Sequence, residues 1–132
     1  MYGSLFWIEW FDRLDRVLTG ARQDLLYLSR AMSPRGMAAI QRSMRLLSAL
    51  GNNLRLLDRQ VLTASADEST PDLADDLQKA LDTAVFRLGS LSNLAATAAP
   101  AIRERMLAGI DAALRDIRYE ADMLLEPRRR RA

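Results

Sequence analysis

The spacing of the apolar residues constrains this chain more than any other feature, because they recur every three or four positions through four long segments. This spacing gathers apolar side chains on one face of an α-helix, whereas a half-buried strand would need strict alternation. Each segment has one such face, which is predicted to form the core. In the first two segments these faces comprise Trp7, Phe11, Leu14, Leu18, Ala21, Leu25, Leu28 and Met32, and Met37, Ile40, Met44, Leu47, Gly51, Leu54 and Val61. In the last two they comprise Leu73, Leu77, Ala80, Ala84, Leu88, Leu91 and Ala95, and Ile102, Met106, Ile110, Ala113, Ile117, Ala121 and Leu124. A single amphipathic helix is only marginally stable in water, so the four segments are expected to pack against one another.

Prolines mark where the predicted helices begin. Ser33-Pro34 and Thr70-Pro71 each pair a good N-cap residue with proline at the first helical position, and Pro100 marks a further start. We predict helices over residues 4–32, 34–64, 71–98 and 100–126. Four helices of similar length with short connections predict a single all-α domain, an up-down-up-down antiparallel four-helix bundle.

Three positions refine this prediction. The apolar phase holds through Gly51, which favours one long second helix, with a break at Gly51 as the alternative. Asp58 falls at a core-phase position, where a carboxylate needs a partner such as an arginine or an indole N–H. Pro127 is expected to end the fourth helix, and the like-charged segment after it, residues 128–132, is predicted to be a disordered basic tail.

Composition excludes several classes of protein. The 132 residues suit one domain, and the chain has no cysteine and no histidine, which removes disulfides, zinc fingers and imidazole chemistry. We expect no catalytic residues, no metal and no cofactor. No run of about 18 apolar residues is present and the first residues do not resemble a signal peptide, so a cytoplasmic protein is expected. Lys79 is the only lysine among 19 basic residues, which suggests a GC-rich bacterial or phage gene.

Aromatic residues are concentrated at the N-terminus, where five of the eight in the chain fall within the first eleven residues. Aromatic side chains are favoured at the centres of protein interfaces because they bury a large area at low entropic cost. One interpretation is a bulky plug that closes one end of the bundle, and another is an anchor at a membrane surface. The docking interpretation assigns contact with a protein partner or a second copy to Tyr2, Leu5, Phe6, Ile8 and Trp10.

Arginines form a second candidate surface. The second helix carries them on its solvent side, whereas the third helix is acidic. These neighbouring helices could pair electrostatically, or the arginines could bind an acidic protein or a nucleic-acid backbone. The predicted basic surface comprises Arg42, Arg45, Arg55 and Arg59, together with Arg128, Arg129, Arg130 and Arg131 of the tail.

A third candidate site lies where the second and fourth helices begin. In an up-down bundle these two starts share one end, and helix N-termini bind anions through free N–H groups and the helix dipole. Four arginines lie within about one turn of the helix ends there. The predicted anion site consists of Arg30, Arg35, Arg103 and Arg105.

Together these features favour a non-enzymatic adaptor or structural assembly protein. It would act by protein–protein contact, with a protein partner or as a homo-oligomer, through the aromatic N-terminal segment and the arginine-rich surfaces. An accessory protein that binds nucleic-acid phosphates through arginines and the basic tail is the alternative, and peripheral membrane association is a third. The salt dependence of binding distinguishes the protein-partner function from the nucleic-acid function. Aromatic docking should persist at high salt, whereas arginine–phosphate contacts should weaken steeply as ionic strength rises.

Overall fold

The computed structural model describes residues 2–30, 33–56, 70–94 and 97–131, with side chains over 9–30, 33–56, 74–94 and 97–124. Four helices account for nearly all of these residues: α1 (Tyr2–Arg30), α2 (Pro34–Leu56), α4 (Thr70–Leu94) and α5 (Pro100–Arg131). The described part of the chain contains no strand, so the predicted all-α class is confirmed.

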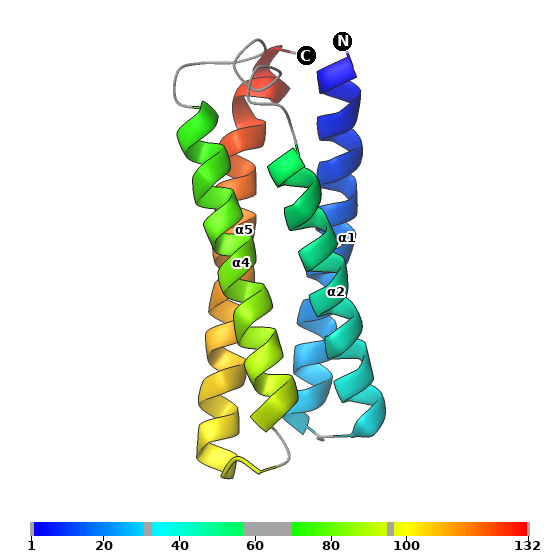
Figure 1. The fold of residues 1–132 in the computed structure, drawn as a ribbon, viewed down its shortest axis with the longest axis vertical. Coiled ribbons are helices and arrows are strands. Elements are labelled where there is room, and N and C mark those ends of the chain that lie inside the picture. Colours follow the sequence, from blue (N-terminus) through cyan, green and yellow to red (C-terminus); the bar gives the residue numbers. More distant parts are fainter. Residues whose placement is uncertain (1, 31–32, 57–69, 95–96, 132) are drawn as a thin grey trace.

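The helices lie side by side along one long axis (Figure 1). Helix α1 packs against α2 and α5, and α4 packs against the same two helices. Figure 1 shows the end of α1, the start of α2, the end of α4 and the start of α5 together at one end of the bundle, which we call the connection end. The start of α1 and the end of α5 lie at the opposite end, which we call the terminal end.

Capping groups fix the helix starts at the connection end. The Ser33 hydroxyl accepts a hydrogen bond from the Gly36 backbone N–H at 3.0 Å, so α2 begins with the predicted N-cap. The Arg103 N–H donates to the Ala99 carbonyl at 3.0 Å, so α5 begins at Pro100 as the proline indicates. Ala99, the residue before α5, has no polar side chain. Helix α5 therefore lacks the side-chain cap that Ser33 provides for α2.

Two helix ends differ from the sequence prediction. Helix α4 ends at Leu94 instead of Ala98, because the Thr97 hydroxyl and two backbone N–H groups converge on the Leu94 carbonyl and close a turn. Helix α5 continues through Pro127 to Arg131 instead of ending before the proline. A proline this close to a helix end removes one backbone hydrogen bond but leaves only one turn beyond it. The disordered tail predicted for residues 128–132 is therefore not confirmed.

Helix α2 runs unbroken through Gly51 to Leu56, so the alternative break at Gly51 does not occur. An alanine Cβ at Gly51 would approach the Gln78 side-chain nitrogen to 3.2 Å, which shows how closely α4 packs here. The predicted end of this helix near residue 64, and Asp58, lie outside the described residues.

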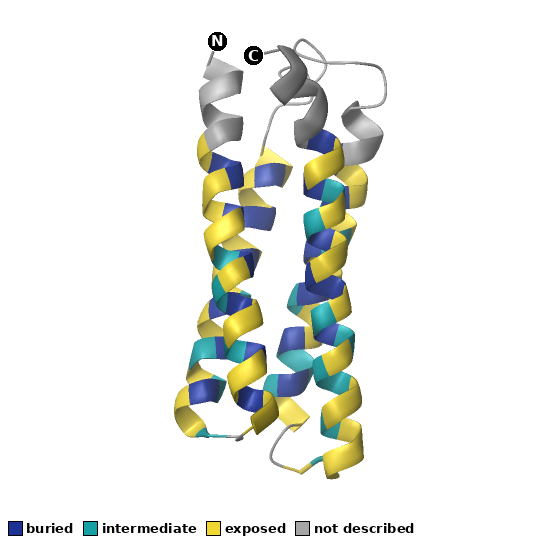
Figure 2. Ribbon diagram, turned by 180° about the vertical axis from the view of Figure 1, so that it is seen from behind, coloured by how far each residue is buried: buried dark blue, intermediate teal, exposed yellow. Residues whose placement is uncertain are grey.

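The core follows the inward faces of all four helices (Figure 2). Every described member of the predicted α1 stripe is buried, and Trp10 joins it, donating its indole N–H to the Leu50 carbonyl at 3.2 Å. The Trp10 and Phe11 rings meet edge to face with centroids 5.3 Å apart. Among the described side chains, Ser43 is the one buried polar group, so burial of apolar area stabilises this fold.

The core predictions for the other helices need correction at several positions. Leu81 is fully buried in α4, whereas Ala80, predicted for the core, is only partly buried. Ile102 was predicted for the core of α5 but is 51% exposed, because it lies in the first turn of that helix, at the edge of the packed bundle. Leu50 and Leu114 are buried although the predicted stripes omit them.

Candidate interaction surface

Formal charge is distributed unevenly along the described bundle. The half at the connection end spans residues 21–30, 34–49, 84–94 and 97–112, and it carries three acidic residues against eight arginines, a net charge of +5. The half at the terminal end spans residues 9–20, 50–56, 74–83 and 113–124 among those whose side chains the structure describes. It carries nine acidic residues against six basic ones, a net charge of −3. Such a field attracts acidic partners to the connection end. The eight arginines are Arg22, Arg30, Arg35, Arg42, Arg45, Arg87, Arg103 and Arg105.

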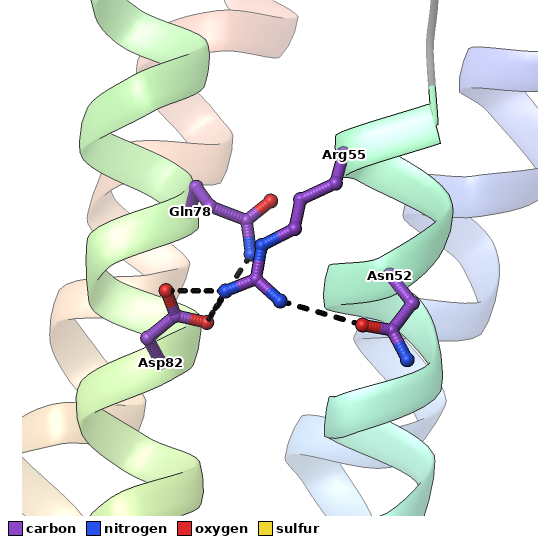
Figure 3. Close-up of polar contacts among 4 residues, drawn as sticks. All are labelled: Asn52, Arg55, Gln78 and Asp82. Carbon is purple, nitrogen blue, oxygen red and sulfur yellow. Dashed lines mark hydrogen bonds and ion pairs between the residues drawn. The ribbon is translucent and has the colours of Figure 1, made fainter.

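The predicted basic face of α2 contains one arginine that is paired with α4 and two that are not. The Arg55 charge is neutralised from α4, because its guanidinium donates to both carboxylate oxygens of Asp82 at 2.6 and 2.7 Å (Figure 3). Asn52 and Gln78 complete the cluster with longer hydrogen bonds to Arg55 and Asp82. The electrostatic pairing expected between these helices is thus present at this position. Both partners are half exposed, so the pair contributes at most about 1 kcal/mol to stability.

Arg42 and Arg45 remain without an ion pair among the described residues, and both are exposed. The 34–56 span of α2 holds no acidic residue that could neutralise them. Leu46, beside Arg45, is 42% exposed and adds apolar area to the same helix. Arg59 lies outside the described residues, as do the side chains of Arg128, Arg129, Arg130 and Arg131. The basic surface that stays available on α2 is therefore centred on Arg42 and Arg45.

The predicted anion site is assembled only in part. Arg30 and Arg103 line one groove of about 240 Å³ between the end of α1 and the start of α5. The Arg103 Nε atom is buried there and has no hydrogen-bond partner within the described part of the chain. Glu104 lines the same groove, and its carboxylate opposes the binding of an anion. Arg35 is exposed on the first turn of α2, and Arg105 lines a different groove, so four arginines do not converge.

The predicted docking segment also needs correction at one residue. Trp10 is only 2% exposed and its indole N–H is bonded to α2, so it is a core residue and cannot contact a partner. The reason is helical phase, since Trp10 shares the inward face of α1 with Leu14 and Leu18. The side chains of Tyr2, Leu5, Phe6 and Ile8 lie outside those that the structure describes.

The seam between α4 and α5 forms a further surface, which the sequence did not predict. The Arg87 guanidinium donates to the Gly109 carbonyl at 2.7 Å and ties the helices together. Towards the connection end, a groove of about 370 Å³ is lined by Arg87 and Arg105 beside Ile102 and Met106. An alternation of basic and apolar residues along α5 could have indicated this face, but only the pairing with α4 reveals it.

The terminal half of the same seam is acidic. Partial burial raises the pKa of Glu120, and the negative charges of Asp76 on α4 and Asp116 on α5 raise it further. Tyr119 and Met123, which lie one helical turn apart on α5, are exposed. The α4–α5 seam thus changes from basic to acidic along its length.

Replacing Glu120 with glutamine should stabilise the fold by a few tenths of a kcal/mol at pH 7. The substitution removes a partly desolvated negative charge and its repulsion from Asp76 and Asp116. The sign follows from the raised pKa. Folding makes Glu120 harder to ionise than it is in the unfolded chain, so the wild type loses stability as pH rises through the raised pKa of Glu120. Urea denaturation at low protein concentration should show the two proteins equally stable well below pH 4.5, the ordinary pKa of glutamate, and the variant more stable at pH 7. A variant that is less stable at pH 7 would contradict this.

Comparisons with protein-family models, curated proteins and solved structures found no match to this chain. Within the described residues, no helix is long and apolar enough to cross a membrane. The same residues include no group of three acidic side chains arranged to hold a metal ion.

Proposed function

We propose that this protein is a non-enzymatic adaptor or assembly protein that binds an acidic protein partner through the exposed arginines of α2. One observation carries the proposal: the described span of α2 has four arginines and no acidic residue, and only Arg55 is matched from a neighbouring helix. Unmatched guanidinium groups on a rigid helix are ready-made ligands for carboxylates, which they bind through two parallel hydrogen bonds.

The surroundings of these arginines support a protein partner. Leu46 beside Arg45 and Tyr27 on α1 are both large and exposed, and both belong to the basic half of the bundle. Protein interfaces combine an apolar centre with a charged rim, and arginine is enriched in them. We propose that the helices form an up-down-up-down antiparallel bundle that holds this surface rigid, that the protein works in the cytoplasm, and that Leu5 and Ile8 supply a separate contact.

Reversing two charges tests the proposal. The variant Arg42→Glu with Arg45→Glu should lose partners that the wild type captures from its source cells, because each changed side chain would repel an acidic surface. The helical circular dichroism should stay unchanged, since both side chains are exposed. Arg13→Glu with Arg16→Glu is the matched control, because these exposed arginines of α1 lie among acidic residues. Proteins retained by the control and lost by the test variant are the expected result.

A labelled DNA duplex provides the decisive contrast. If the α2 arginines serve phosphates, the duplex should bind the wild type, with an affinity that falls steeply with salt and disappears in the double variant. That result would overturn the acidic-protein proposal in favour of a nucleic-acid accessory protein. Equal binding by the double variant and the control variant supports the protein partner, because it separates the α2 arginines from phosphate binding.

A further inference from the structure

A stripe of residues runs along α5 on the side that faces α4 and solvent. Its members recur every three or four positions, which keeps them on one face of the helix. Two contacts locate this stripe beside α4: Arg87 reaches the Gly109 carbonyl, and Asp76 lies close enough to raise the pKa of Glu120. From the connection end, the stripe reads Ile102, Arg105, Gly109, Ala112, Asp116, Glu120 and Met123.

The order of chemistry along this stripe is self-complementary. Ile102 and Met123 lie at its two ends and are 51% and 41% exposed. Arg105 comes next from one end and Glu120 from the other. Ile102 and Met123 form one pair, and Arg105 and Glu120 form the other. In sequence, the midpoint of both pairs falls between positions 112 and 113. An identical stripe running in the opposite direction would therefore set apolar against apolar and basic against acidic.

We propose that a second copy of this chain packs on the α4–α5 face, with the two α5 helices antiparallel about a twofold axis beside Ala112. Arg105 then lies level with Glu120 of the partner subunit, and Ile102 lies level with Met123 of the partner subunit. The Arg87 guanidinium, held at Gly109, comes level with Asp116 of the partner subunit. Twofold symmetry forms each contact twice, which is how isologous dimers arise.

The centre of the stripe suits close approach of a second helix. An alanine Cβ built at Gly109 would meet no atom within 4 Å, so packing within one chain does not require glycine there. Glycine inside a helix is less favourable than alanine, so a reason outside the single chain would account for it. Ala112, one turn further, is small and exposed. Small residues at the crossing point let two helix axes approach to about 8 Å.

The area available indicates a dimer in equilibrium with monomer. From Ile102 to Met123 the stripe is about 33 Å long at 1.5 Å per residue, and two adjacent helices are about 20 Å wide. This face offers roughly 600 Å² per subunit, at the lower end for specific interfaces. The acidic half of the face also carries Lys79 on α4, so the charge separation is sharpest along α5. Concentration-dependent association is therefore expected.

Sedimentation equilibrium of the full chain over a range of concentrations tests the dimer by charge exchange. Arg105→Glu alone, or Glu120→Arg alone, should weaken dimerisation at least about tenfold, because each places like charges opposite one another twice. An equimolar mixture of these two variants should dimerise again, as should the variant that carries both changes. Arg42→Glu is the control and should leave dimerisation unchanged.

A cysteine at the axis gives an independent readout, since the chain has no cysteine of its own. Ala112→Cys should form a disulfide-linked dimer on mild oxidation, and Ala38→Cys, on exposed α2 surface, should not. A wild type that stays monomeric, or a dimer that tolerates Arg105→Glu, would overturn the proposal. The acidic-partner proposal is tested apart from this one, because Arg105→Glu leaves the α2 arginines in place and Arg42→Glu leaves the α4–α5 face in place.

Discussion

Replacing Trp10 with alanine should lower the free energy of unfolding by about 3–5 kcal/mol, the cost of removing a large buried aromatic side chain. Trp10 is 2% exposed, packs edge to face against Phe11 and donates its indole N–H to the Leu50 carbonyl on α2. Its removal would leave a cavity between α1 and α2. A domain of this size is stable by about 5–15 kcal/mol in all, so urea denaturation should show a large shift in midpoint.

Trp10→Phe is the matched control, because it keeps an aromatic ring and removes the indole donor. It should cost about 1–2 kcal/mol, since the Leu50 carbonyl loses one hydrogen bond and the smaller ring leaves part of the space empty. If Trp10 instead belonged to a docking surface, its replacement by alanine would change association with a partner more than stability. A stability loss below about 1 kcal/mol for Trp10→Ala, accompanied by a changed association state, would return Trp10 to the docking segment.

The sequence was sufficient for the class of the fold and for several of its boundaries. Apolar spacing predicted helices, and a Ser-Pro pair or a lone proline located the starts of α2 and α5. These signals are local, because an N-cap and its proline act within one turn of backbone. The α1 core was also predictable, since Leu14, Leu18 and Leu25 keep one strict phase.

Local pattern did not decide which of two adjacent apolar positions enters the core. Positions 80 and 81 both fit a spacing of three or four residues, and the packing of α4 against α2 and α5 buries Leu81. The predicted anion site is only partly assembled for a related reason. Sequence places four arginines near the same helix ends, but their directions around each helix bring only Arg30 and Arg103 to one groove, whereas Arg105 lines another. Sequence alone also did not show which side of α5 lies beside α4, because the Arg87 contact that locates it comes from another helix.

Replacing Leu81 with alanine should cost about 2–5 kcal/mol, because its fully buried side chain would leave a cavity among rigid neighbours. Leu56→Ala makes the same chemical change at a leucine that is 82% exposed, and it should alter stability by less than about 0.5 kcal/mol. Ala80→Gly tests the competing phase and should cost only the helix propensity of about 1 kcal/mol. Thermal and urea denaturation of the three variants would rank them. If Leu56→Ala proved as costly as Leu81→Ala, Leu56 would have to be covered, and the surface of α2 would be an occupied interface even in the isolated protein.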